Sequence, residues 1–340
     1  MTVDSLADKG TFGVWAAALR GIPRLGEEQW RKLDLVARWL IATRAAVLVM
    51  TFLSAAIAGI LAIRARQFDL ARWSIMTIGL LMAHATNNLI NDLTDHWTGV
   101  DRDNPFRTQY GPQPVENGFV TVGQQILMAA VTGVAALACG IYLVSVTDRL
   151  TLLLMAIGVA CVLFYTWPLK HIGLGEPVVL LVWGPMMVGG GYYVITEQWS
   201  WDVVVASLVY GLGVTAVLFG KHIDKIPFDT KINVRTLPVL LGERKARWVV
   251  RGMLVAQYLA VGYLVAAGAL GWPLLLVIFA LPRLRMVWQT FSEPKPEERP
   301  ESYPASAWPL YFVSFAFVHN RRFGSLFLLG LVIDAAWILY

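Results

Sequence analysis

The sequence predicts an all-α, multi-pass membrane helix bundle with about nine transmembrane helices. Of its 340 residues, 57% are hydrophobic and only 15% are charged. The mean hydropathy is +0.58, and a soluble domain needs more polar surface than this. Apolar runs also recur near the length of about 20 residues that a helix needs to cross a bilayer.

The first 38 residues are predicted to be a cytoplasmic or interfacial leader, since their polarity is mixed and they lack the apolar centre of a signal peptide. Part of the leader can form an amphipathic helix at the membrane surface. A transmembrane catalytic domain is expected over 39–340. Its predicted spans are 39–63, 70–91, 123–146, 150–168, 174–195, 202–220, 247–267, 269–289 and 322–340.

Two features near the C-terminus do not fit this regular pattern. The run 304–318 is short, contains two prolines and is rich in aromatic residues, so we predict an interfacial or re-entrant helix there. Asp334 lies inside the last predicted span, and nothing in the sequence explains a carboxylate at that place.

Basic residues orient the chain in the membrane. They are abundant in the leader and in the loop after the sixth span, whereas 196–201 and 268–272 contain none. We therefore expect the N-terminus and the even-numbered loops on the cytoplasmic side of a bacterial-type plasma membrane. Arginines between the first two spans run against this pattern: Arg64, Arg66 and Arg72.

The net charge of +5 follows from this topology and does not call for a nucleic-acid partner. Cys139 and Cys161 both lie in apolar runs, so no disulfide framework is expected.

The first polar stretch, NNLINDLTDHWTGVD (87–101), follows the second predicted span. Asn88, Asp92 and Asp95 are spaced so that they share one face of a helix. Like charges placed so closely repel each other, and more strongly where water is scarce, so a metal ion would stabilise them. Magnesium prefers oxygen ligands, usually one or two carboxylates together with substrate phosphates. A solvated helix end is the plain alternative for this stretch alone.

The second polar stretch, GKHIDKIPFDTKINVRTLPVLLGER (220–244), follows the sixth span. It contains Asp224 and Asp229 among lysines and arginines. Carboxylates for metal beside cations for phosphate oxygens suit a diphosphate–magnesium complex. Four crossings separate the two stretches, so both must lie on the same side of the membrane. Their matching positions favour one shared site over two solvated turns.

Lys170 lies in a third segment on that side, FYTWPLKHIGLGEP (164–177), after the fourth span. Basic residues commonly occupy helix ends with the charged group directed to the interface. Its position on the same side as both polar stretches favours a phosphate contact.

These segments resemble known signatures. NLINDLTDHWTGVD, YTWPLKHIGLGE and DKIPFDTKINVRTLPVLLGERKAR are similar to three consecutive signatures of the UbiA superfamily of intramembrane prenyltransferases, in particular the branch that makes menaquinone precursors from dihydroxynaphthoate. The similarity extends from about Arg44 to the ninth span. The pattern N-x-x-x-D-x-x-D followed by G-V-D is the specific part, and R-T-L-P-V-x-L-G is nearly as informative.

The resemblance implies a nine-helix bundle with a central cavity that opens laterally to lipid. It also implies two Mg²⁺ ions bridging an isoprenyl diphosphate, one on Asn88, Asp92 and Asp95 and the other on Asp224 and Asp229. The basic residues expected to bind the diphosphate are Arg44, Lys170, Lys221, Lys225, Arg102 and Arg107. An arginine such as Arg44 is costly in lipid, so we expect it to face a polar cavity.

Three departures from the family pattern concern the site. Four residues separate Asp224 from Asp229 where the family usually has three, so one ligand is expected to be displaced. The residues before this pair are Gly220, Lys221 and His222 instead of an Asn-rich run, and the lysine can replace a polar ligand with a phosphate contact. Pro114 stands where relatives tend to carry arginine, and Arg102 or Arg107 can compensate.

The predicted reaction is Mg²⁺-dependent transfer of an isoprenyl group from an isoprenyl diphosphate to an aromatic acceptor. A terpene cyclase, which ionises the same diphosphate without an acceptor, is the main alternative. A transporter is a third reading, although its ion sites would be expected near the midplane of the membrane. No residue identifies itself as the final proton acceptor; His222 is a better candidate than His84 or His96 because it lies two residues before Asp224.

Overall fold

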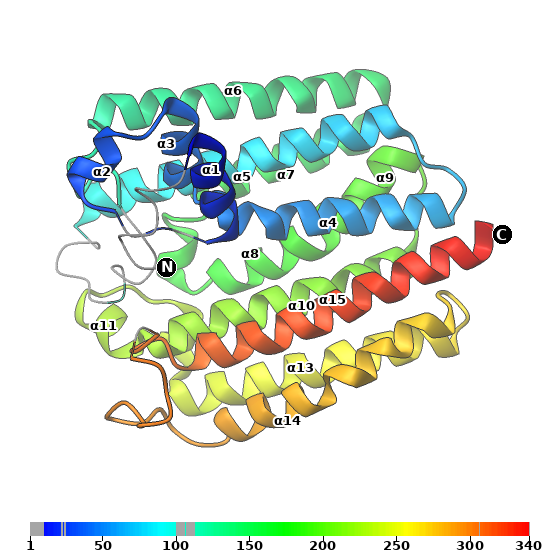
Figure 1. Ribbon diagram of the computed structural model, residues 1–340. Coiled ribbons are helices and arrows are strands. Elements are labelled where there is room, and N and C mark those ends of the chain that lie inside the picture. Colours follow the sequence, from blue (N-terminus) through cyan, green and yellow to red (C-terminus); the bar gives the residue numbers. More distant parts are fainter. Residues whose placement is uncertain are drawn as a thin grey trace.

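The computed structural model describes residues 10–21, 23, 25–99, 106, 113–305 and 307–339. In this part of the chain the secondary structure is helical, with no strand. Long helices run side by side along one direction, and the connecting segments gather at the two ends of the bundle (Figure 1). The predicted all-α class is confirmed.

The leader forms three short helices beside the bundle. They are α1 (Thr11–Arg20), α2 (Glu27–Arg31) and α3 (Leu35–Ala42). Trp30 of α2 is buried at 2% exposure, and its ring stacks on that of Phe119 from the segment before α6. The leader is therefore packed onto the membrane domain.

Nine helical segments correspond to the nine predicted spans. They are α4 (Ala45–Arg64), α5 (Leu70–Thr98), α6 (Val122–Val146), α7 (Arg149–Phe164), α8 with η4 and α9 (Gly175–Leu181, Val182–Gly190, Gly191–Thr196), α10 (Trp201–Asp224), α13 (Glu243–Ala266), η5 with α14 (Trp272–Ala280, Leu281–Thr290) and α15 (Phe312–Leu339). Short helices η3 (Leu169–Ile172), α11 (Ile226–Lys231) and α12 (Leu237–Leu241) lie in the connections. Six of the segments in the described residues are long and apolar enough to cross a membrane; the full count of nine stays a prediction.

Side-chain caps set where several long helices begin. Asp69, Thr121, Asp148 and Ser200 each accept a backbone N–H from the first turn of α5, α6, α7 and α10, respectively. The first N–H groups of a helix have no partner within it, so a side-chain oxygen at this position stabilises the helix end.

The first and last spans differ from their predicted extents. Helix α3 ends at Ala42 and α4 begins at Ala45, because Arg44 adopts a left-handed conformation with φ of 54°; the predicted span 39–63 is therefore broken. The prediction of an interfacial or re-entrant helix over 304–318 is wrong. Turns precede Phe312, which begins α15, and this helix runs on without interruption to Leu339.

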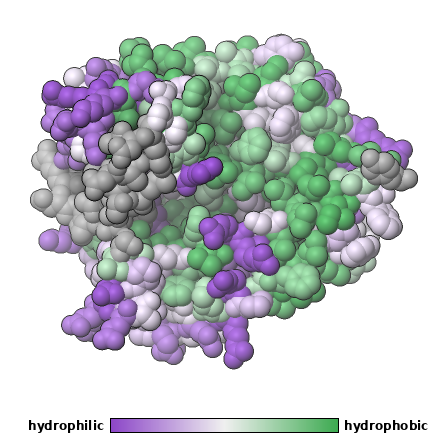
Figure 2. All heavy atoms as spheres, in the orientation of Figure 1, coloured by the Kyte–Doolittle hydropathy of each residue, from purple (hydrophilic) through white to green (hydrophobic). Residues whose placement is uncertain are grey.

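Helix α10 lies at the centre of the bundle and α6 at its edge. Of the most apolar 18-residue window of α10, 67% is buried, against 17% for α6. Helix α10 packs against η4, α13 and α15, and a Cβ on Gly211 would lie only 3.1 Å from Cα of Gly184 in η4. The face of the molecule shown in Figure 2 is apolar over a broad area, as expected for a surface in contact with lipid.

The C-terminal ends of α5, α7, α10 and α14 lie at one end of the bundle, together with α1, α2 and α3 (Figure 1). The two polar stretches therefore begin at the same end, in agreement with the expected common side. The arginines at the opposite end have partners there. Arg64 pairs with Asp334 at 2.7 Å, and Arg72 pairs with Glu197 at 2.6 Å. The carboxylate in the last span is thus explained by Arg64.

Candidate active site

The first polar stretch forms the last turns of α5, which continues to Thr98. Asn88, Asp92 and Asp95 share one face as predicted, and they are buried at 9%, 3% and 3% exposure. The Nδ2 group of Asn88 donates to the carbonyl oxygen of Thr43 at 2.8 Å. This bond ties α5 to the break between α3 and α4 and leaves the amide oxygen of Asn88 for another partner.

Arg44 occupies that break and forms an ion pair with Asp92. The left-handed conformation is unfavourable for a residue with a side chain, so its retention here indicates a constraint from the surroundings. The Arg44 side chain is 12% exposed. The arginine is thus directed to a carboxylate inside the protein; that it faces a polar cavity stays a prediction.

Lys170 brings a third segment to the same place. It lies in η3, after α7, and its Nζ atom is 3.5 Å from Oδ1 of Asp95. The two side chains are 11% and 5% exposed, so solvent screens this pair weakly. Asn91 donates to the hydroxyl of Thr166 at 3.2 Å and so also links α5 to the end of α7.

The two carboxylates of the second polar stretch have different partners. Asp224 is the last residue of α10 and lies against the beginning of α15 and Lys295. Lys225 and Asp229 pair with each other, with Nζ of Lys225 3.0 Å from Oδ1 of Asp229. Among the described residues, no other group donates a hydrogen bond to the buried Asp229 carboxylate.

The electrostatics connect this part of the second stretch with the first. Burial lowers the pKa of Lys225, Asp229 raises it, Lys170 lowers it and Asp95 raises it. The pKa of His171 is lowered by burial and by Lys170, and raised by Asp95 and Asp229. Since interactions between charges weaken with distance, these groups belong to one site that combines cations and carboxylates.

The structure gives less information on the other residues that are predicted to bind phosphate. Lys221 lies in the last turn of α10 and is partly exposed. Arg102 and Arg107 lie outside the described residues. The predicted roles of all the site residues in binding metal or diphosphate stay predictions.

The three histidines named from the sequence are all held by neighbouring side chains. Nδ1 of His84 is 2.8 Å from Oγ1 of Thr51, and Nδ1 of His96 is 2.5 Å from Oε2 of Glu116. Nδ1 of His222 is 2.5 Å from Oε1 of Glu176, a buried carboxylate at the beginning of α8.

Two charged residues of the site region were not predicted. Oε2 of Glu176 also accepts the backbone N–H of Leu237 at 3.3 Å, so it joins α8, α10 and α12. Its signal in the sequence was a lone carboxylate at the start of an apolar span, a place where charges are rare. Lys295 had no such signal, because it lies among other charges in SEPKPEE.

Magnesium fits part of this arrangement. Within the described ranges, no group of three or more His, Cys, Asp or Glu residues could hold a metal by itself. Magnesium needs fewer protein ligands when phosphates complete its coordination. The buried oxygens of Asp229, to which no described group other than Lys225 donates a hydrogen bond, suit a cation, as do the amide oxygen of Asn88 and the carboxylates of α5.

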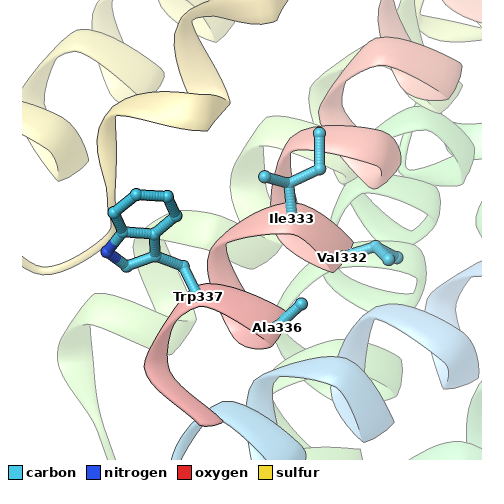
Figure 3. A pocket seen from close by; sticks show the side chains of 4 residues that line it. All are labelled: Val332, Ile333, Ala336 and Trp337. Atoms are coloured by element: carbon cyan, nitrogen blue, oxygen red, sulfur yellow. The ribbon is translucent and has the colours of Figure 1, made fainter. Parts of the chain in front are cut away.

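A separate hollow lies near the C-terminal end of α15, away from the polar stretches. Figure 3 shows its lining by Val332, Ile333, Ala336 and Trp337. These side chains are apolar, and Trp337 is 72% exposed. The hollow offers no charged group for a diphosphate and is part of the apolar outer surface.

Known proteins share this sequence pattern and fold. The chain is 28% identical over 235 residues to 2-carboxy-1,4-naphthoquinone phytyltransferase from Synechocystis, covering 65% of this chain and 73% of the relative. It is 24% identical over 298 residues to 1,4-dihydroxy-2-naphthoate octaprenyltransferase from Bacillus subtilis, covering 86% and 91%.

The fold is similar to that of a solved UbiA homolog from Archaeoglobus fulgidus bound to GPP and Mg²⁺. The TM-score is 0.59 at 12% sequence identity, and the match covers 87% of this chain and 99% of the other. The model of the UbiA prenyltransferase family matches residues 52–316. This match includes both polar stretches and Lys170, and the chain belongs to the UbiA prenyltransferase family.

Proposed function

We propose that the protein transfers an isoprenyl group from an isoprenyl diphosphate to an aromatic acceptor of the quinone-precursor type, and that the reaction depends on Mg²⁺. One observation carries this proposal. Buried carboxylates from α5 and α11 meet Lys170 and Lys225 at one end of an otherwise apolar bundle. Such a site can bind a highly charged diphosphate while the attached hydrocarbon chain remains among apolar helices.

The basic residues hold the leaving group. The ammonium groups of Lys170 and Lys225 lie where they can bind oxygens of the diphosphate and stabilise the negative charge that develops there as the allylic carbon–oxygen bond breaks. Arg44, through its ion pair with Asp92, holds that carboxylate beside the site. Bound magnesium, held by Asn88, Asp92 and Asp95, would further neutralise the diphosphate.

The acceptor supplies the electrons for the new carbon–carbon bond. An electron-rich aromatic ring attacks the cation-like allylic carbon. The ring carbon that formed the new bond then loses a proton, or neutral CO2 where it carried a carboxylate, and the electrons of the broken bond restore aromaticity. The membrane domain excludes water, which limits hydrolysis of the reactive intermediate. The names of the Synechocystis and Bacillus subtilis relatives specify naphthoquinone and naphthoate substrates, and this supports an acceptor with a naphthalene ring.

The site is proposed to open on the cytoplasmic side of the membrane. The helices of the leader and the C-terminal ends of α5, α7, α10 and α14 share one end (Figure 1), and the segments that follow these helices carry most of the basic loop residues. The leader, proposed as a separate unit over 1–38, is suited to the membrane interface. Its Phe12 and Leu35 are 79% and 81% exposed, as side chains that insert among lipids would be.

The test is diphosphate release by the purified protein in detergent, with Mg²⁺ and geranylgeranyl diphosphate, with and without 1,4-dihydroxy-2-naphthoate. We expect release that requires the naphthoate, yields a prenylated naphthalene product and is lost with EDTA. Asp92→Asn and Asp229→Asn should abolish it, whereas Asp148→Asn, which alters a carboxylate cap at the opposite end of the bundle, should retain it.

Two results would contradict the proposal. Release without the naphthoate, accompanied by a new hydrocarbon or terpene alcohol, would identify a cyclase. No release with any isoprenyl diphosphate and aromatic acceptor, from protein that is folded and binds the diphosphate, would exclude both reactions.

A further inference from the structure

The carboxylate of Asp224 is engaged by the beginning of α15. Its Oδ1 accepts the backbone N–H of Phe312 at 3.0 Å, and its Oδ2 accepts that of Val313 at 3.1 Å. These are first-turn N–H groups that the helix itself cannot satisfy, and a negative charge there is also favoured by the helix dipole. Nζ of Lys295 lies 3.4 Å from Oδ1 and donates to the carbonyl oxygen of Pro309 at 2.6 Å. Asp224 therefore acts as the cap of α15.

Gly220 makes this contact possible. A Cβ at this position would lie 2.9 Å from the backbone nitrogen of Val313 and 3.0 Å from the carbonyl carbon of Phe312. These distances are too short for a side chain, so α10 and α15 approach each other here backbone to backbone. One helical turn later in α10, the close approach of the two helices brings the carboxylate of Asp224 to the first N–H groups of α15. The glycine at this point of the second stretch is thus explained by α15.

Lys225, the next residue in the chain, has a different partner from Asp224, namely the carboxylate of Asp229. Its Nζ atom is 3.0 Å from Oδ1 of Asp229, and the two side chains are 10% and 1% exposed. Both oxygens of Asp229 are buried, and within the described part of the chain no group other than Lys225 lies where it can donate to them. A buried carboxylate without a partner is costly. The ammonium of Lys225 beside it lowers that cost.

We propose that Lys225, held by its ion pair with Asp229, is the part of the second polar stretch that faces the diphosphate, and that Asp224 caps α15 and binds no metal. The ammonium of Lys225 then neutralises diphosphate oxygens at the place where the family resemblance implies a second Mg²⁺. This inference rests on the proposed function and replaces the two metal ions that the resemblance implies with one.

Two physical reasons support a single ion. A Mg²⁺ at the second stretch would have one carboxylate, Asp229, with the ammonium of Lys225 3.0 Å from it, whereas α5 offers three ligand side chains on one face, Asn88, Asp92 and Asp95. Asp224 could turn toward a metal only by abandoning two buried backbone N–H groups, which would then have no acceptor. The one Mg²⁺ is therefore expected at the carboxylates of α5.

Metal binding to the full-length protein in detergent tests the inference. Mn²⁺ is titrated in the presence of geranyl thiolodiphosphate, which resists ionisation, and bound Mn²⁺ is counted by electron paramagnetic resonance. The wild-type chain should bind a single Mn²⁺ in a diphosphate-dependent manner. Asp224→Ser should lower Tm by a few degrees through loss of the cap and leave the half-saturating Mn²⁺ concentration unchanged. Asp69→Ser, at the cap of α5, is the matched control.

Lys225→Met should weaken binding of the thiolodiphosphate about 10- to 100-fold, as expected for the loss of one charge-assisted contact. The number of bound Mn²⁺ ions should not change. Lys225→Arg should restore most of the affinity, because it returns the positive charge. A purely structural role of Lys225 would instead lower Tm and leave the affinity of the folded protein intact.

Two bound Mn²⁺ ions in the wild type would overturn the inference. So would an Asp224 variant that raises the half-saturating Mn²⁺ concentration at an unchanged Tm. Asp224→Asn retains one acceptor oxygen and serves if the serine variant does not fold. Because no acceptor is present in these measurements, a failure of prenyl transfer would overturn the proposed function alone, whereas absence of any thiolodiphosphate binding would overturn both.

Discussion

Replacement of Lys170 by methionine tests the core of the proposed site. Nζ of Lys170 lies 3.5 Å from Oδ1 of Asp95, and the two side chains are 11% and 5% exposed. Methionine has a similar length and no charge. Hydrogen bonds to charged groups contribute about 1.5–3 kcal/mol, and weak solvent screening at this exposure leaves most of that contribution in place. The variant should therefore bind the diphosphate about 10- to 100-fold more weakly.

The assay is the KM for geranylgeranyl diphosphate, obtained from diphosphate release at saturating acceptor and Mg²⁺. Lys231→Met is the matched control, because Lys231 is an exposed lysine in the nearby helix α11 and its loss should leave KM unchanged. If Lys170→Met kept the wild-type KM and only lowered Tm, the lysine would serve to neutralise Asp95, and the reasoning would be refuted.

Three further changes probe the architecture around the site. Glu176→Gln weakens the buried pair with His222 at 2.5 Å and should lower the stability by about 1–3 kcal/mol, seen as a lower Tm in detergent. Asp334→Asn leaves the partly exposed Arg64 without its partner and should cost about 1–3 kcal/mol, less than a fully buried pair, with unchanged kcat in protein that remains folded. Gly220→Ala places a methyl group against the backbone of α15 and should lower both Tm and the yield of folded protein.

For each of these three predictions, one result of the measurement would contradict it. Gly262→Ala is the control for the glycine change, since nothing lies within 4 Å of a Cβ there and alanine favours the helix; equal Tm values for the two alanine variants would disprove close contact at Gly220. A normal Tm for Glu176→Gln would mean that the pair with His222 contributes little. Loss of activity in stable Asp334→Asn protein would show that the far end of the bundle affects catalysis.

Periodicity and composition were enough to predict the helical class and most of the spans. The spacing of Asn88, Asp92 and Asp95 predicted a shared helical face, and α5 has that face because it continues unbroken to Thr98. The prediction for 304–318 was wrong. Aromatic residues and prolines there suggested a separate short helix, but Phe312 begins the last long helix and the prolines lie before it.

The sequence did not predict the individual contacts between residues that are far apart in the chain. The break at Arg44 lies within a mostly apolar run, and the structure relates it to contacts with α5, namely the ion pair of Arg44 with Asp92 and the hydrogen bond from Asn88 to Thr43. Asp224 was expected to bind metal because it lies near Asp229. Its actual partners, the first N–H groups of α15, come 88 and 89 residues later in the chain.

Local composition and spacing predict a bundle of apolar helices with two groups of carboxylates and lysines on one side, because helix formation and transfer into lipid depend on the local sequence. Which of those charges meet depends on the tertiary structure. A carboxylate becomes a helix cap, an ion-pair partner or a ligand according to which donors other helices bring within hydrogen-bonding distance, and that choice differs between Asp224 and Asp229, only five positions apart.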